Sequence, residues 1–95
     1  MVDTGYQELA EDLSSDTKDM HRAIISLIEE LEAVDVYNQR AEICTDDALK
    51  AILLHNRDEE KEHASMLLEW IRRQDQSFDK QLKRFIFSDE AIKDK

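Results

Sequence analysis

The sequence lacks the residues that interrupt helices. Its 95 residues include no proline and a single glycine, Gly5, which lies near the N-terminus. Both residue types destabilise a helix interior, so long helices can run without a break after this point. Aromatic residues make up only 6% of the chain, and its β-branched residues are too scattered for the alternating pattern of a sheet. The composition therefore predicts an all-α protein, and the length predicts one small domain over residues 1–95.

Cysteine is almost absent as well. Cys44 is the only one in the chain, which excludes an intrachain disulfide and fits a reducing compartment. No hydrophobic run approaches the length of a membrane span, and the first residues show no basic segment followed by an apolar one, as a signal peptide would. The sequence thus predicts a cytoplasmic protein that does not insert into a membrane.

Positive charge is in deficit. There are 13 Lys and Arg residues against 23 Asp and Glu residues, which gives a formal net charge of −10 at pH 7. Proteins that bind nucleic acid or an anionic membrane surface are usually basic, so both partners are disfavoured. The acidic surface suits attraction of metal cations, and it is equally consistent with charge that only keeps a helical surface soluble.

Apolar residues recur at steps of three and four from about residue 6 to about residue 40 and predict one long helix there. The run from Ser14 to Thr17 is the weak point of this helix. Because Ser and Thr are good N-caps, the helix can begin there instead, with the earlier turns as a separate piece. The apolar positions are Leu9, Leu13, Met20, Ala23, Ile24, Leu27, Ile28, Leu31 and Val34.

A second periodic segment predicts a helix from about residue 46 to about residue 74, with Thr45 as its N-cap. A shorter helix is expected at residues 77–87, followed by a mobile tail at residues 88–95. The short connection makes the first two helices an antiparallel hairpin. Such a hairpin has a wide apolar stripe and too little chain to cover it, so two copies are expected to pair into a four-helix bundle.

Three polar residues interrupt the apolar stripes of the two long helices. Glu30 lies three residues after Leu27 and four before Val34, so it shares their buried face. Glu60 and His63 form a Glu-x-x-His and interrupt the second stripe in the same way. Buried carboxylates are costly unless they are paired or bind a metal ion. The pattern therefore predicts a metal site between the helices.

Ferritin-like bundles build a carboxylate di-iron site from one Glu on each of two helices and a Glu-x-x-His on each of the other two. This chain supplies half of that set, and a second copy would complete it. Oxygen ligands with one imidazole per metal suit iron or manganese better than structural zinc. Simpler explanations exist: Glu30 as part of a solvated acidic face, and His63 as an exposed or hydrogen-bonded histidine. His21 and His55 are either further ligands or surface residues.

Three segments of the chain carry a resemblance to a known family. They are residues 21–35 followed by Tyr37, residues 55–63 and residues 68–73, and both metal-bearing segments occur at the matching separation. From about residue 17 to residue 87 the chain closely resembles the encapsulated ferritins. The resemblance implies a two-helix hairpin with a short third helix, a dimer of hairpins, and a ring-shaped decamer of five dimers.

The resemblance also implies an enzymatic function. Encapsulated ferritins are ferroxidases, which oxidise Fe(II) to Fe(III) with dioxygen inside an encapsulin nanocompartment, whose shell stores the iron. By this resemblance Glu30, Glu60 and His63 from each of two chains hold two irons, and Tyr37 lies beside the centre as a hydrogen-bond donor. From the residues alone, Tyr37 is equally well explained as a packed interface tyrosine.

The resemblance assigns Glu29 and Glu32 to an acidic site where ferrous iron arrives and where calcium or other divalent cations can bind. Two features depart from the family pattern. Val36 stands at a position where family members can carry tryptophan, and residues 89–95 show no Gly- and Leu-containing peptide of the kind that docks cargo to the shell. If the resemblance holds, we expect that this signal was removed from the chain or that it lies outside these 95 residues.

Two other functions are open on the sequence. The chain can be an acidic helical module that dimerises and recruits a partner without redox chemistry. It can also be a different di-metal enzyme, such as a manganese oxidase or a peroxide-consuming protein related to rubrerythrins. No Cys-x-x-Cys is present to hold a rubredoxin-type iron, which weakens the rubrerythrin alternative.

Overall fold

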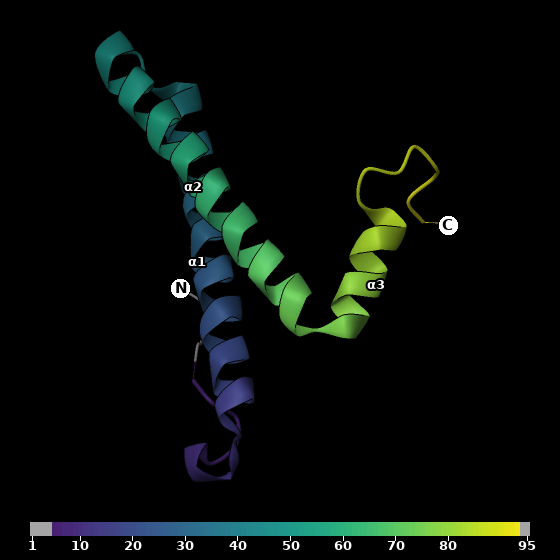
Figure 1. Cartoon of the computed structure of the whole chain (residues 1–95). Coiled ribbons are helices and arrows are strands. Elements are labelled where there is room, and N and C mark those ends of the chain that lie inside the picture. Colours follow the sequence, from purple (N-terminus) through teal and green to yellow (C-terminus); the bar gives the residue numbers. More distant parts are fainter. Residues whose placement is uncertain (1–4, 94–95) are drawn as a thin grey trace.

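The computed structural model describes residues 5–93, and the regular elements in this range are all helices. A short 3-10 helix, η1 (Ala10–Asp12), precedes three α-helices, α1 (Ser15–Ile43), α2 (Asp47–Gln74) and α3 (Gln76–Phe85). α1 and α2 run antiparallel as a hairpin, and α3 turns away from the end of α2 (Figure 1). The predictions of an all-α fold and of a hairpin with a short third helix are confirmed for the described residues.

The first helix begins later than predicted. α1 starts at Ser15 instead of about residue 6, and η1 occupies part of the segment before it. Ser14 has an extended backbone, and its hydroxyl accepts a hydrogen bond from the Thr17 N–H at 3.2 Å. This cap satisfies an N–H that a helix start leaves free, which stabilises a start at this point. The single helix from about residue 6 is therefore wrong, and the alternative start after Ser14 is correct.

The other two helices begin at aspartate caps. Asp46, rather than the predicted Thr45, caps α2 by accepting a hydrogen bond from the Leu49 N–H at 2.8 Å. Asp75 ends α2 and also caps α3, where it accepts from the Phe78 N–H at 2.8 Å. A carboxylate adds a favourable interaction with the positive end of the helix dipole, which a hydroxyl does not. One residue, Asp75, thus marks both the end of α2 and the start of α3.

The third helix ends earlier than predicted. α3 stops at Phe85, and Phe87 adopts a φ of 59°, in the left-handed region that ends many helices. Residues 88–93 form no regular element. The mobility of the tail stays a prediction, and residues 94–95 lie outside the described part of the chain.

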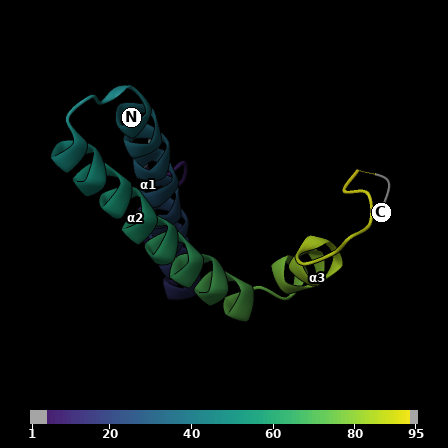
Figure 2. The ribbon, with the colours of Figure 1, turned by 90° about the horizontal axis from the view of Figure 1, so that it is seen from above.

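The three helices do not close into a bundle. α1 contacts α2 and α2 contacts α3, but α3 makes no contact with α1. Viewed from above, α3 projects sideways from the hairpin (Figure 2). The Cα radius of gyration is 16.9 Å, whereas a compact domain of this length would have about 12 Å. The molecule is therefore an open hairpin with an arm.

The core of the single chain is small. Within residues 5–93 the buried apolar side chains are Ala23, Ala41, Ala64 and Ile71, and the three alanines lie on the hairpin helices. Many larger apolar side chains of the hairpin are exposed instead: Ile24, Leu31, Leu49, Ile52, Met66 and Trp70. The hairpin alone thus leaves uncovered the apolar surface that a four-helix bundle would bury. The dimeric bundle itself stays a prediction.

Candidate metal centre

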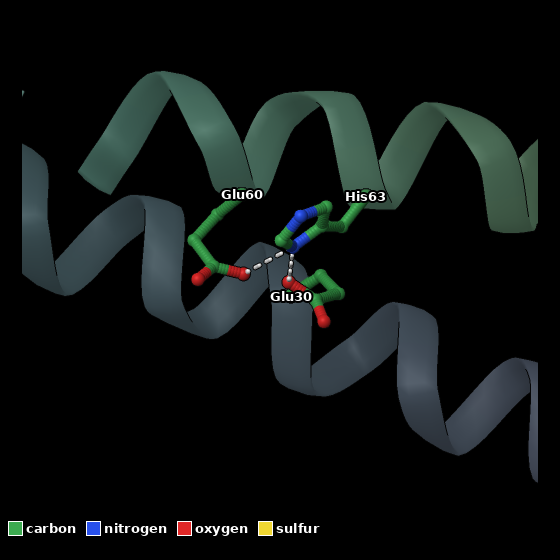
Figure 3. A group of neighbouring side chains, drawn as sticks. All are labelled: Glu30, Glu60 and His63. Atoms are coloured by element: carbon green, nitrogen blue, oxygen red, sulfur yellow. Dashed lines mark hydrogen bonds and ion pairs between the residues drawn. The ribbon is translucent and has the colours of Figure 1, made fainter. Parts of the chain in front are cut away.

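The three polar residues predicted from the apolar stripes meet between the hairpin helices. Glu30 projects from α1, whereas Glu60 and His63 project from α2, one turn apart (Figure 3). Residues three or four apart share one face of a helix, so each of the three follows its apolar neighbours into the space between the helices. Packing of the hairpin therefore brings together side chains that are about thirty residues apart in the sequence.

His63 lies between the two carboxylates. Its Nδ1 is 3.3 Å from Glu60 Oε2 and 3.4 Å from Glu30 Oε2. Ligand atoms from the three residues all lie within 4.8 Å of one another. Ligands on opposite sides of one metal ion are separated by twice the metal–ligand distance, about 4–5 Å. The spacing of the three side chains thus suits one shared cation.

One carboxylate oxygen of the group is buried without a hydrogen bond. Glu30 Oε2 is closed to solvent and accepts no hydrogen bond, although it lies 3.4 Å from His63 Nδ1. A buried anionic oxygen without a donor is costly, and a bound cation removes that cost. The environment of Glu30 therefore fits a metal ligand better than a structural ion-pair partner.

Among residues 5–93, Glu30, Glu60 and His63 form the one group of three or more His, Cys, Asp or Glu side chains that are close enough together to bind a metal ion. It offers two carboxylates and one imidazole, a set that suits iron or manganese and lacks the soft thiolates of a structural zinc site. Three ligands also leave coordination positions open. Those positions can take ligands from another chain, or a reactant.

The other predicted site residues lie outside this group. Glu29 and Glu32 are both exposed on α1. Tyr37 is half-buried, and the guanidinium carbon of Arg40 lies 5.8 Å from the centre of its ring. The assignments of Glu29 and Glu32 to an iron-arrival site, and of Tyr37 to the centre, stay predictions.

The sequence analysis did not identify one residue that lies beside the group, Glu59. Glu59 Oε2 lies 4.0 Å from Nε2 of His63. The other carboxylate oxygen of Glu59 lies 3.6 Å from Nε2 of His55. The steps of four residues from His55 to Glu59 to His63 place all three on one helical face, and this spacing was the signal available in the sequence.

Comparison with known proteins places the chain in a family. Residues 5–89 match the family described as EncFtn-like. The chain belongs to this family. The encapsulated ferritin-like protein of Rhodospirillum rubrum is 53% identical to this EncFtn-like chain over 85 residues, 90% of the chain and 61% of that relative. A ferritin-like protein of Thermotoga maritima is 46% identical over 87 residues, 92% of the chain and 76% of that relative.

The EncFtn-like chain spans 61% of the length of the Rhodospirillum rubrum relative. It is also similar to the crystal structure of a protein from Nitrosomonas europaea, with a TM-score of 0.91 and 66% identity over 94% of this chain and 98% of that one. The resemblance to encapsulated ferritins inferred from the motifs is thus confirmed.

In residues 5–93, no helix is both long and apolar enough to cross a bilayer.

Proposed function

We propose that this EncFtn-like chain is a ferroxidase whose di-iron centre forms between two copies of itself. The observation that carries the proposal is the Glu30–Glu60–His63 group with its buried oxygen that lacks a hydrogen bond. One chain supplies two carboxylates and one imidazole, which is half of the ligand set of a ferritin-like di-iron centre. A second copy related by a twofold axis would supply the other half.

The exposed apolar side chains of the hairpin support this pairing. Large apolar patches on a soluble protein usually mark an interaction surface, and Ile24, Leu31, Ile52 and Met66 are all exposed in the single chain. Pairing two hairpins into a four-helix bundle would bury such side chains, at about 25 cal/mol of stabilisation per Å² of apolar area. The hydrophobic effect would thus drive the association that completes the metal centre.

Ferrous iron is the substrate in the proposed reaction. Glu30 and Glu60 would bind it through carboxylate oxygens, and His63 would bind it through Nδ1. Anionic ligands attract Fe(III) more strongly than Fe(II), because the Coulomb energy grows with the charge of the ion. The ligand set therefore favours loss of an electron from each of two ferrous ions. The two electrons reduce one dioxygen molecule, which takes up two protons from water and leaves as hydrogen peroxide.

Three residues around the centre would assist the reaction. Glu29 and Glu32 are exposed on α1 and lie close to Glu30 in the sequence. Together with the net charge of −10 of the whole chain, their carboxylates would attract ferrous ions, calcium and other divalent cations to the centre. Tyr37, two turns after Glu30 on α1, would donate a hydrogen bond at the edge of the centre.

The proposal extends to assembly and location. It includes the ring of five dimers that the sequence resemblance implies, together with enclosure in a cytoplasmic encapsulin shell. The name of the Rhodospirillum rubrum relative, an encapsulated ferritin-like protein, supports the enclosure. In this setting the chain would oxidise iron and the shell would store it.

Native mass spectrometry tests the shared centre. The purified chain is measured without metal and after anaerobic addition of Fe(II), and stopped-flow absorbance then follows oxidation when air is admitted. We expect two irons for every two chains of 11.2 kDa, in an even-numbered assembly of up to ten chains. A stable assembly that takes up no stoichiometric iron would instead favour the alternative function, an acidic helical module that recruits a partner without redox chemistry.

Two ligand variants and a control assign the residues. Glu60→Ala and His63→Ala are expected to stay helical, because apolar packing holds the hairpin, and to lose both stoichiometric iron and fast oxidation. Glu62→Ala removes an exposed carboxylate from the same helix and should behave as the parent chain. An unchanged oxidation rate in either ligand variant would contradict the assignment of the site.

A further inference from the structure

The imidazole of His63 has different neighbours at its two nitrogens. Nδ1 lies 3.3 Å from Glu60 Oε2 and 3.4 Å from Glu30 Oε2. Nε2 points away from both of these carboxylates (Figure 3). On that side the neighbour is Glu59, whose Oε2 lies 4.0 Å from Nε2. Each ring nitrogen thus has its own carboxylate partner, and the three carboxylates come from both helices of the hairpin.

Metal binding at Nδ1 requires one particular tautomer of His63. A neutral imidazole carries a proton on one nitrogen and a lone pair on the other. Without a metal ion, a proton on Nδ1 is favoured because Glu60 can accept a hydrogen bond from it. With a metal ion at Nδ1, the lone pair is needed there and the proton has to reside on Nε2. A group that accepts a hydrogen bond from Nε2–H favours this tautomer.

We propose that Glu59 is a positioning residue for the metal centre, which accepts a hydrogen bond from Nε2–H of His63 when Nδ1 binds the metal ion. The proposal rests on the proposed function, because it presupposes metal at the Glu30–Glu60–His63 group. A carboxylate behind a ligating histidine fixes the tautomer and the orientation of the ring and makes the ligating nitrogen more basic. Glu59 would act in this way from outside the set of ligands.

The geometry of Glu59 is suited to this role. Its separation of 4.0 Å from Nε2 is longer than a hydrogen bond, as expected while the proton is at Nδ1. The side chain of Glu59 is 47% exposed, so it has room to move by the distance required. Its other oxygen, Oε1, lies 3.6 Å from Nε2 of His55, one helical turn earlier on α2.

Cobalt(II) provides a probe of this hydrogen bond that does not depend on catalysis. Co(II) resembles Fe(II) in its preference for oxygen and nitrogen ligands, and its visible absorption bands report the geometry of the ligands. The assembled full chain is titrated with Co(II) by calorimetry and by absorption spectroscopy, for the parent and for Glu59→Gln and Glu59→Ala. Alanine has the highest helix propensity, so Glu59→Ala keeps the exposed face of α2 helical.

Glu59→Ala is expected to weaken Co(II) binding by about tenfold or more, the usual effect of removing the partner of a ligating histidine. It should also shift the visible bands, because the ring is no longer held in one orientation. Glu59→Gln retains an oxygen that can accept the same hydrogen bond, so we expect it to recover most of the affinity and the parent spectrum. A purely electrostatic role would not produce this recovery, because glutamine carries no charge.

The control variants are Glu62→Gln and Glu62→Ala, which remove an exposed charge one residue before His63. They should bind Co(II) as the parent does. The proposal is overturned if Glu59→Ala binds Co(II) with the parent affinity and spectrum. It is also overturned if the Gln and Ala variants at Glu59 and at Glu62 all weaken binding equally, since that result shows only attraction between charges.

The result for the parent chain separates this proposal from the proposed function. A parent chain that binds no stoichiometric Co(II) or Fe(II) would overturn the metal centre itself, and the role of Glu59 with it. If the parent chain binds metal and the Glu59→Ala variant is indistinguishable from it, only the role of Glu59 is overturned.

Discussion

The side chain of Arg72 on α2 donates a hydrogen bond to Asp79 on α3 and so ties the two helices together. The same guanidinium donates two hydrogen bonds to Glu69, at 2.6 and 2.7 Å. Glu69 also accepts from Arg73 at 2.6 Å, and Asp79 pairs with Lys83 at 2.9 Å. These five residues form a charged clamp at the junction of α2 and α3. The clamp, together with the Asp75 cap, sets the direction in which α3 leaves the hairpin.

The clamp should weaken in acid. Hydrogen bonds from Arg72 and Arg73 lower the pKa of Glu69 from its ordinary value of 4.5 to about 2. Because the pKa is lower in the folded protein than in the unfolded one, the contribution of Glu69 is complete above pH 4.5 and is lost as the pH falls toward 2. Lys83 and then Arg72 lower the pKa of Asp79, so it responds in the same direction.

Hydrogen exchange can follow this loss. Protection factors of the α3 amides, relative to those of α1, should fall between pH 4.5 and pH 2. The expected change is about two- to fivefold, since the charges are exposed and screened by water. The matched variant is Arg72→Gln, which should lower α3 protection already at pH 7 and flatten its pH dependence. If Arg72→Gln keeps the pH dependence of the parent, the clamp does not control α3.

Ile71 should be the residue most sensitive to truncation. It is 1% exposed and is the only large apolar side chain that the described part of the single chain buries completely. Ile71→Ala leaves a cavity, so we expect a loss of about 2–5 kcal/mol in the free energy of unfolding. Urea unfolding at fixed protein concentration measures the loss. Ile92→Ala, at an exposed position beyond α3, is the matched control, and a comparable loss there would contradict the prediction.

Glu30 should reduce stability in the absence of metal. Its buried oxygen accepts no hydrogen bond, and a second carboxylate, Glu60, is a member of the same group. Glu30→Gln removes the charge and should raise the free energy of unfolding by about 1 kcal/mol, a usual gain for relief of strain at a functional site. Thermal unfolding in a chelator should then shift upward by about 4–8 °C.

The control for this measurement is Glu42→Gln, an exposed position on the same helix, which should change stability by less than about 0.5 kcal/mol. Glu30→Gln should at the same time lose stoichiometric iron. A variant that is less stable than the parent in chelator would show that the carboxylate serves the fold rather than the metal.

Leu31 tests the proposed pairing of two hairpins. Its side chain is 54% exposed in the single chain and follows Glu30 directly in the sequence. Leu31→Glu places a charge on the surface that a second copy would cover. The dissociation constant of the dimer should therefore rise at least about tenfold. Analytical ultracentrifugation over a range of concentrations measures this change.

The matched control for Leu31 is Gln39→Glu, which adds the same charge at an exposed polar position of the same helix. It should assemble as the parent does. If Leu31→Glu assembles normally as well, the second copy does not cover this face of α1.

The helix boundaries show how much of the fold the local sequence pattern predicts. The long periodic segments correctly predicted two long helices, because burial of an apolar stripe decides helix formation over many turns. The predicted start of the first helix at about residue 6 and the predicted cap of the second were wrong. Asp46 rather than Thr45 caps α2, and Ser14 rather than a residue near Tyr6 precedes α1. Neighbouring cap candidates differ by about 1 kcal/mol or less, and the periodicity does not separate such small differences.

The sequence by itself determined the helical class, the hairpin and the face on which Glu30, Glu60 and His63 lie, because residue spacing on a helix fixes direction around its axis. Only the tertiary structure decided that Glu30 meets His63 at 3.4 Å while its neighbours Glu29 and Glu32 stay outside the group. That outcome depends on the rotation and offset of α1 against α2. Packing across the whole hairpin sets both quantities, and no local stretch of sequence encodes them.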